Sequence, residues 1–349
     1  MAGFDYQGGG VDFAAMARNR QARLLAANAH LTVTVMDVGA GTVTVSAMTP
    51  GSTGKSARTL TRSQPSSPVT AANYSAGLRH ETRFDKNQSD RMSITDLYAA
   101  VKAIGDSKET AGSLVEVSVL SHGFIGGPIL VDSDDGSTGT ARDPDDKDAR
   151  AGKDFKWPNM NAAELAAFKA AFAPNAFWWS WGCTFSEAYR QVTSRFINSP
   201  LYRRTPAGTL KDTDKVAFEF PQDMAEDIYG VDVLFFPQAK RVGRKSAGKF
   251  KDLSFERTVI DIKDFLRRGI RRTYHVAVGK AGGVQARGAF LGTYADYELD
   301  DPSIKLPLMQ IPRSTKIYGT DFTRYLRMWV KDLGFSEDPE GHGYGVFTP

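Results

Sequence analysis

Two residues whose types could perform nucleophilic chemistry each follow an apolar stretch of the sequence. His122 follows SLVEVSVLS, and Cys183, the single cysteine of the chain, follows AFWWSWG. A free thiol is only a few per cent ionised at neutral pH, and a nearby imidazole or a helix N-terminus favours the thiolate. An imidazole can also protonate a leaving group. The pair therefore predicts a cysteine nucleophile assisted by a histidine that acts as general acid and base.

Glycines flank both candidate residues, because Gly123 follows His122 and Gly182 precedes Cys183. A residue without a side chain lets a substrate carbonyl approach its own backbone N–H. The N–H groups of Gly123 and Cys183 could then form an oxyanion hole. The competing interpretation is structural: a His-Gly turn where a strand surfaces, and a tryptophan-rich strand that belongs to the core.

The segments around the two residues alternate between strand and helix patterns. The apolar runs 113–120 and 176–182 are typical of strands buried on both faces, as in a parallel sheet. Between them, 161–173 predicts a helix capped by Asn161 with Glu164 in the capping-box position. Such alternation predicts a doubly wound sheet, in which sites form beyond the carboxyl ends of the strands. We therefore expect His122 and Cys183 at the same edge of neighbouring strands.

The N-terminal part of the chain, 1–79, differs in pattern from the rest. A helix is expected over 13–30, a β-hairpin over 31–45, and a linker rich in Ser, Thr, Gly and Pro over 49–79. We interpret 1–79 as an N-terminal appendage and 80–349 as the main α/β domain.

The order strand, SHG, acidic loop, helix, FWWSWGC and helix resembles the caspase-like (clan CD) cysteine peptidases, which include caspases, metacaspases and gingipains. Their pattern is an apolar block ending in His-Gly and a second ending in Ala-Cys or Gly-Cys, which His122-Gly123 and Gly182-Cys183 match. The resemblance implies a three-layer α/β/α sandwich with a mainly parallel central sheet. It also implies an endopeptidase that cleaves peptide bonds through a thioester acyl-enzyme on Cys183. The caspase pentapeptide around the nucleophile is absent here, so cleavage after aspartate is not implied.

An acidic segment follows the histidine strand, with eight aspartates between Asp132 and Asp154. Aspartate-rich loops supply the hard oxygen ligands that calcium prefers. Metacaspases often require calcium, so the resemblance implies a calcium-activated enzyme with Asp132, Asp134 and Asp135 as the ligands nearest the site. The EF-hand pattern does not fit, and a solvated, flexible loop that binds no metal is the simpler interpretation.

Two further segments bear on substrate and activation. The stretch FLGTYADYE follows the strand that the resemblance places beside the cysteine strand, and Asp296 or Glu298 there would favour Lys or Arg before the cut bond. A surface turn is the simpler account of them. The basic loop 240–251 falls where caspase-like zymogens are often cut, which would permit self-processing, although a solvated connector is the simpler account.

Bulk properties exclude several classes of protein. A formal charge of +4 on 349 residues gives no case for nucleic-acid binding, and we find no apolar run of membrane-spanning length. One cysteine cannot form an internal disulfide framework. The N-terminus lacks a secretory signal pattern, so we expect a cytoplasmic protein, or one exported without a cleaved signal, that acts on a protein or peptide substrate. The sequence sets no oligomeric state.

Two alternatives to a peptidase remain open. HGFIGG resembles the oxyanion loop of α/β-hydrolases acting on esters, with His342 available as a late histidine, but no glycine stands two residues before or after Cys183 as the nucleophile elbow requires. A catalytically inactive caspase-like binding module would instead have a buried, unreactive Cys183. His275, among arginines in a helix expected over 261–283, is predicted to lie on the surface.

Overall fold

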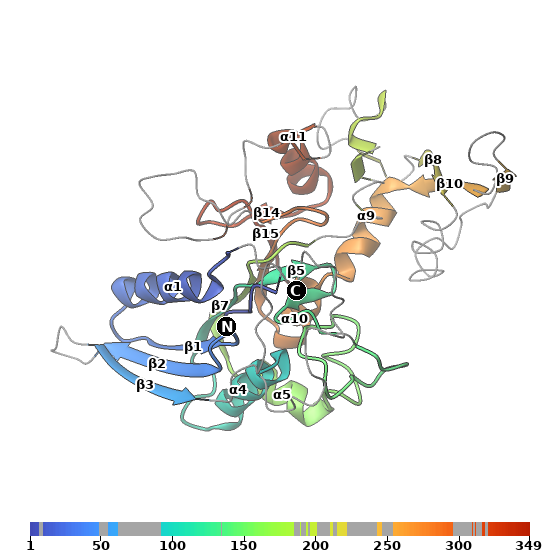
Figure 1. The fold of residues 1–349 in the computed structure, drawn as a ribbon. Coiled ribbons are helices and arrows are strands. Elements are labelled where there is room, and N and C mark those ends of the chain that lie inside the picture. Colours follow the sequence, from blue (N-terminus) through green and yellow to red (C-terminus); the bar gives the residue numbers. More distant parts are fainter. Residues whose placement is uncertain are drawn as a thin grey trace.

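The protein is described from a computed structural model, shown in Figure 1. The longer stretches that it describes run over 1–6, 10–48, 55–61, 92–133, 135–184, 254–295 and 320–349. Shorter described stretches lie at 189, 193–194, 196–200, 210–211, 215–221, 243–245, 309, 311 and 316–317.

A five-stranded mixed sheet forms the centre of the molecule, with the strand order β14-β15-β11-β7-β4. Its bounds are β4 Leu114–Val119, β7 Phe172–Ser180, β11 Gln285–Gly288, β14 Ser336–Glu337 and β15 Gly345–Phe347. Strands β4, β7 and β11 are parallel neighbours, whereas β15 and β14 add in antiparallel fashion. The two strands that precede His122 and Cys183 are therefore adjacent and parallel, as expected from the single helix between them.

Capping residues set the start of the two helices that flank β4 in the chain. Helix α4 spans Ile94–Asp106 and α5 spans Ala162–Ala170. Each begins with a capping box, in which Ser93 and Asp96, and likewise Asn161 and Glu164, exchange side-chain and backbone hydrogen bonds. The sequence pattern places the start at Asn161 correctly because capping is a local interaction.

Helices pack against both faces of the sheet. On one face Val117, Val119 and Trp178 join a cluster with α4, α5 and helix α10, which spans Tyr274–Gly282. On the other face Trp179 and Trp181 join a cluster with α1 (Phe13–Ala27), α9 (Ile262–Arg271) and α11 (Phe322–Arg327). Side chains of successive strand residues point to opposite faces, and Trp178 and Trp179 show that β7 is buried on both sides. Strand β4, at the edge of the sheet, is not buried throughout as expected, because Val115 is exposed. The protein is a mixed α/β structure.

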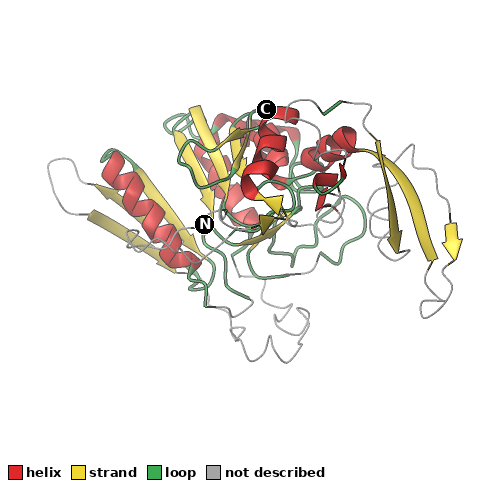
Figure 2. Ribbon diagram, turned by 90° about the horizontal axis from the view of Figure 1, so that it is seen from above, coloured by secondary structure: helices red, strands yellow, loops and turns green. Residues whose placement is uncertain are grey.

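The N-terminal segment is hydrogen-bonded to the edge of this sheet. Ala2 forms parallel bridges with Leu120 after β4 and with Asp37 at the end of β1, so it connects the central sheet to a second one. That second sheet is antiparallel, with the order β1-β2-β3 and the bounds Thr32–Asp37, Thr42–Met48 and Lys55–Thr61. Figure 2 shows α1 lying across these strands at one side of the molecule.

Helix α1 is fixed to the central sheet by a buried ion-pair network. The guanidinium of Arg20 donates to both carboxylate oxygens of Glu116 on β4, at 2.8 Å each. It also donates to Glu340, at 2.6 and 3.0 Å. Bidentate pairs of this kind fix orientation as well as adding energy. The network therefore holds helix α1 against β4.

Three expectations about secondary structure need correction. Strand β3 lies inside 49–79, so that range is not a continuous linker; its edge-strand sequence KSARTLT is polar and lacks an apolar signal. The helix expected over 261–283 is broken at Thr273, which is the N-cap of α10. The strand expected over 176–182 begins earlier, because β7 starts at Phe172 and ends at Ser180. Helix α11 continues into a π-helical turn at Met328–Asp332. The proposed boundary at 79/80 lies outside the described residues.

The remaining described strands form small antiparallel sheets outside the central one. Strands β5 (His122–Phe124) and β6 (Gly127–Ile129) form an antiparallel pair directly after β4. Figure 2 also shows a projecting sheet of order β8-β10-β9, with the bounds Lys215–Pro221, Ser254–Asp261 and Gly243–Lys245. Strands β12 (Lys316–Ile317) and β13 (Thr320–Asp321) precede α11. Among the residues described, no helix is long and apolar enough to cross a bilayer.

Candidate active site at the ends of β4 and β7

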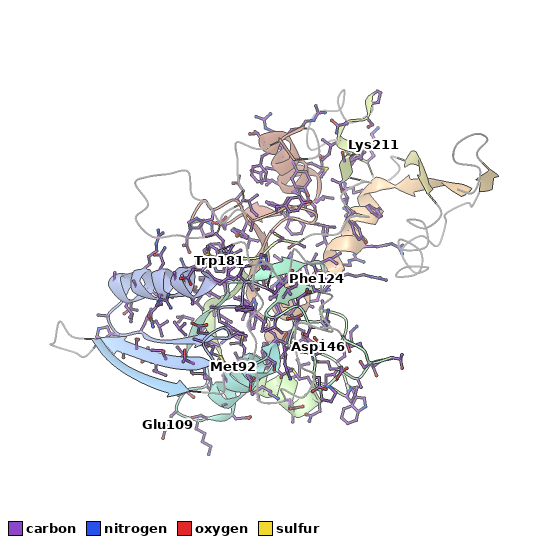
Figure 3. The ribbon with its side chains drawn as sticks, in the orientation of Figure 1. Met92, Glu109, Phe124, Asp146, Trp181 and Lys211 are labelled. Carbon is purple, nitrogen blue, oxygen red and sulfur yellow. The ribbon has the colours of Figure 1, made fainter. Side chains whose placement is uncertain are left out.

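The two predicted site segments lie in backbone contact. A Cβ atom placed on Gly123 would lie 2.6 Å from the carbonyl oxygen of Cys183, and one on Gly182 would lie 2.6 Å from the carbonyl oxygen of Ser121. Real Cβ atoms do not approach backbone oxygens so closely, so both glycines are required by this contact. Figure 3 places the nearby labelled residues Trp181 and Phe124 close to the centre of the molecule. His122-Gly123 and Gly182-Cys183 are therefore side by side.

Cys183 is half-buried, and its sulfur receives a hydrogen bond. The backbone N–H of Ala295 donates to Sγ at 3.3 Å. The chain around Ala295 is held beside the cysteine because Thr184 N–H donates to Thr293 O and Gly292 N–H donates to Thr184 O. An N–H donor favours a charged acceptor over a neutral one. The segment after β11 thus supplies a group that stabilises a thiolate at Cys183.

The ring of His122 is enclosed by the N-terminal part of the chain. Its Nε2 lies 2.9 Å from Oδ1 of Asp5. The rings of Tyr6 and Phe13 meet it edge-on, with centroid separations of 4.9 and 5.1 Å. The residue is 5% exposed. His122 is therefore a buried imidazole with a carboxylate partner.

Burial and nearby carboxylates act in opposite directions on His122. Desolvation disfavours the imidazolium and lowers the pKa of His122 below its usual value, whereas Asp5 and, more weakly, Asp132 favour the charged form. Burial is the larger effect, so the imidazole is neutral near pH 7. A neutral imidazole can accept the thiol proton and return it to a leaving group.

A cavity of about 10 Å³, the space of roughly one water molecule, lies beside Cys183. Three elements form its walls: the β5–β6 pair, the end of β7 and the start of α10. They contribute Gly123, Phe124, Gly127, Pro128, Ser180, Gly182, Cys183, Thr184, Tyr274 and His275. The lining includes the thiol and Gly123, whose N–H is proposed for the oxyanion hole. His122 is not part of the lining, since its ring contacts Asp5, Tyr6 and Phe13.

The surface position predicted for His275 is wrong. This residue is 6% exposed, forms part of the cavity wall, and has Nε2 3.2 Å from the hydroxyl oxygen of Thr273. Burial lowers the pKa of His275 to about 4. The physical reason is that Arg267, Arg268 and Arg271 belong to α9, whereas His275 belongs to the first turn of α10.

The acidic segment is not solvated throughout, because three of its aspartates are buried with partners inside the segment. Asp146, Asp148 and Asp154 are buried. Arg142 pairs with Asp146 and Asp154, and Arg150 pairs with Asp146. Asp148 accepts three backbone hydrogen bonds, from the N–H groups of Leu130, Val131 and Ser133. Arg142 and Arg150 compensate the buried charges of Asp146 and Asp154, and backbone N–H groups compensate Asp148.

The residues proposed to bind calcium are only partly described. Asp134 lies outside the described residues, and Asp135 is paired with Lys153 at 2.6 Å. Within the part of the chain that the structure describes, no three His, Cys, Asp or Glu side chains are grouped to hold a metal ion. Asp135 would have to exchange Lys153 for a cation, so the described carboxylates do not form a ready calcium site. Asp296 and Glu298, proposed for the substrate pocket, also lie outside the described residues.

Sequence reasoning misses two contributors to the site, Asp5 and the N–H group of Ala295. Asp5 is 117 residues from His122 in the chain, and Ala295 is 112 residues from Cys183. Asp5 stands in a glycine-rich opening with no strand or helix pattern, and a backbone N–H has no residue type that could mark it. Both groups reach the site through tertiary contacts, which the local periodicity of the sequence does not predict.

Comparisons with known proteins identify no similar protein. No protein-family model matches the chain, and the searches of curated proteins and of solved structures give no match.

Proposed function

We propose that the protein is a cysteine endopeptidase of the caspase-like type, with Cys183 as nucleophile and His122 as general acid and base. The observation that carries the proposal is the backbone contact between His122-Gly123 and Gly182-Cys183 at the ends of β4 and β7. A contact that requires a glycine on each side brings the histidine and the cysteine segments together at the sheet edge where α/β proteins form their sites.

The proposed reaction proceeds in two steps. His122 takes the proton of Cys183, Sγ forms a bond to the scissile carbonyl carbon, and the C–N bond breaks as His122 gives that proton to the leaving amine. Water then attacks the thioester and loses a proton to His122, and the acid product leaves as Sγ regains a proton. The N–H groups of Gly123 and Cys183 bind the oxyanion, and the N–H of Ala295 stabilises the thiolate.

The finer features of the fold belong to the same proposal. A caspase-like α/β/α sandwich with a mainly parallel sheet is supported by the parallel order of β4, β7 and β11 and by apolar clusters on both faces. We propose the pair β1–β2 as a hairpin added to this domain, and a protein or peptide as the substrate. Asp296 and Glu298 would select Lys or Arg before the cut bond.

A panel of fluorogenic peptides, varied at the residue before the scissile bond, tests the proposal. The full chain is expected to cleave a subset of them, with Lys and Arg preferred, and iodoacetamide should abolish that cleavage. Cys183→Ala should have no activity, and the same variant should no longer be alkylated at this position. Turnover that persists in Cys183→Ala would refute the assignment of the nucleophile.

A catalytically inactive caspase-like module is the second candidate. It is favoured by the small size of the cavity beside Cys183, about 10 Å³, and by the burial of His122. This candidate predicts that native Cys183 resists alkylation at neutral pH and that no peptide of the panel is cleaved. Mass mapping of iodoacetamide adducts, with the unfolded chain as the positive control, separates it from the peptidase.

Calcium activation and self-processing can be tested in the same assay. Calcium binding at Asp132, Asp134 and Asp135 requires Asp135 to leave Lys153, so calcium should increase both alkylation of Cys183 and peptide turnover. Unchanged rates in the presence of calcium or of a chelator would exclude the switch. Self-processing predicts a cut within 240–251 that is absent from Cys183→Ala, which intact-mass measurement would detect.

A further inference from the structure

The strongest feature that the proposed function does not use is the carboxylate of Asp5. Its Oδ1 lies 2.9 Å from Nε2 of His122, and its Oδ2 accepts a hydrogen bond from Val11 N–H at 3.0 Å. Both oxygens therefore have a partner, so the carboxylate is held in one orientation. The side chains of Asp5 and His122 are both largely buried, which removes much of the competition from water.

The backbone that carries Asp5 is fixed by strands on both sides of His122. Gly3 N–H donates to Leu120 O at 2.9 Å, and Phe4 N–H donates to Leu130 O at 2.7 Å. A Cβ on Gly3 would lie 2.6 Å from Cβ of Ser121, so the segment passes directly over the chain leading to His122. Asp5 is thus placed by the same sheet edge that places the histidine.

Two aromatic rings complete the setting of the imidazole. Tyr6 and Phe13 meet the His122 ring edge-on, at interplanar angles of 66° and 84°. Contacts on the ring edges restrict its rotation about χ2, and the hydrogen bond to Asp5 selects one of the remaining orientations. The N-terminal segment therefore fixes the position of the His122 ring.

We propose that Asp5 is a positioning residue for His122: it keeps the proton of the neutral imidazole on Nε2 and leaves Nδ1 as the nitrogen that exchanges a proton with thiol and leaving group. This inference rests on the proposed peptidase function. A ring nitrogen that donates to a carboxylate is committed to that bond, and the tautomer of a histidine is set by the hydrogen bond of its other nitrogen.

The charges around His122 give this arrangement its effect on pH. Asp5 faces the ring from the N-terminal segment and Asp132 acts on it from the chain after β6, while Tyr6 and Phe13 contribute a phenol and an apolar ring. Of the two carboxylates, Asp5 has the larger influence. Removing its charge leaves burial less opposed, so the imidazolium becomes harder to form.

The test uses the full-length chain with Asp5→Asn, which keeps the size of the side chain and removes its charge. We expect kcat to fall by about 100-fold, within the range of general acid–base effects, with KM nearly unchanged. The acidic limb of the kcat/KM profile should move to lower pH. In ¹⁵N-histidine NMR spectra, His122 should be the Nε2–H tautomer in the wild type and a mixture in the variant.

Asp12→Asn is the matched control, because Asp12 lies in the same segment and its carboxylate caps α1 by accepting from Ala15 N–H. Asparagine is an equally good N-cap, so this variant removes a charge without disturbing His122. Should Asp5→Asn lower stability, Asp5→Glu, which restores the carboxylate, is expected to recover part of kcat and the Nε2–H signal.

Two outcomes would overturn the inference. The first is an unchanged His122 tautomer together with an unchanged kcat in Asp5→Asn, and the second is a rise in kcat, which would mean that the segment masks the histidine. Failure of the proposed function looks different, since the wild type would then have no thiol-dependent turnover. The NMR measurement still decides whether Asp5 sets the tautomer.

Discussion

His122 and His275 are buried to nearly the same extent, 5% and 6% exposed, but their surroundings differ in charge. His122 has the carboxylate of Asp5 at 2.9 Å, with Asp132 also acting on it. Within the described residues, the side-chain partner of His275 is the hydroxyl of Thr273. Burial lowers the pKa of both, but carboxylates oppose it at His122, whereas burial alone acts on His275 and lowers its pKa to about 4.

The difference teaches that burial does not by itself identify a catalytic histidine. A histidine that must gain and lose a proton during a reaction needs a group that stabilises its charged form. Asp5 provides such a group for His122. His275 instead acts as a neutral wall of the cavity beside Cys183.

The largest expected effect comes from replacing each histidine in turn. His122→Ala should lower kcat/KM by about 10³-fold, because it removes the group that transfers the proton in the proposed reaction. His275→Gln should leave kcat/KM within about tenfold of the wild type, since that side chain transfers no proton in the proposed reaction. Steady-state kinetics on the best peptide of the panel measure both values. The reverse order would show that His275 is the base that serves Cys183.

Replacement of Gly123 by alanine tests whether the contact of the strand ends matters as much as the side chains. The added Cβ would lie 2.6 Å from Cys183 O, so the His122 segment must move away from the cysteine. We expect a loss of about 1–3 kcal/mol in the free energy of unfolding and a fall in kcat/KM of about tenfold or more. Gly152→Ala is the control, because a Cβ there meets no atom within 4 Å. Equal effects of the two substitutions would refute the contact.

Local signals explain why part of this site could be predicted from the sequence. The apolar runs before His122 and Cys183, and the capping boxes at Ser93 and Asn161, depend on residues close in the chain, and the strands and helices lie within a few residues of their expected ranges. The adjacency of β4 and β7 follows from the single helix between them. Chain topology therefore accounts for the juxtaposition of the two segments.

Other features of the site and fold could not be predicted, because they depend on contacts between residues that are distant in the chain. Asp5 lies in a stretch without periodicity and reaches His122 only through the pairing of the N-terminal segment with Leu120 and Leu130. The position of His275 could not be predicted because one apolar pattern covers two helices, which the N-cap Thr273 divides. The burial of the acidic segment is not evident from the sequence because Arg142 reaches Asp154, and the backbone at Leu130 reaches Asp148, only after folding.

Measuring the free energy of unfolding at several pH values tests the difference between His122 and His275. The pKa of His275 is about 4 in the folded state and about 6.5 in an unfolded chain, so only the unfolded chain binds a proton between these values. The stability contributed by neutral His275 is complete above about pH 6.5 and is lost as the pH falls towards 4. By pH 4 this loss should reach about 2–3 kcal/mol relative to His275→Gln.

Urea unfolding of the wild type, His275→Gln and His122→Gln at pH 7, 5.5 and 4.5 measures this loss. His122→Gln should change the pH slope less than His275→Gln does, because Asp5 opposes the effect of burial on His122. Identical slopes for the two variants would mean that the carboxylate gives His122 no advantage in binding a proton.

The smallest expected effect concerns Asp135, whose charged form, like that of His122, is stabilised by an oppositely charged side chain. Burial alone would raise the pKa of Asp135, but Lys153 and the Ser137 hydroxyl lower it to about 2. The folded carboxylate therefore keeps its charge where an unfolded aspartate gains a proton, so its stabilising effect is complete above about pH 4 and is lost towards pH 2. Asp135→Asn should lower the free energy of unfolding at pH 7 by about 1 kcal/mol, and the difference from the wild type should shrink as the pH falls. Asp145→Asn, at an exposed position of the same segment, is the control for general charge effects. If both variants lose the same stability with the same pH dependence, the net charge of the acidic segment, and not the ion pair between Asp135 and Lys153 at 2.6 Å, determines its stability. A charged partner such as Asp5 would then also be expected to have less influence on the protonation of His122.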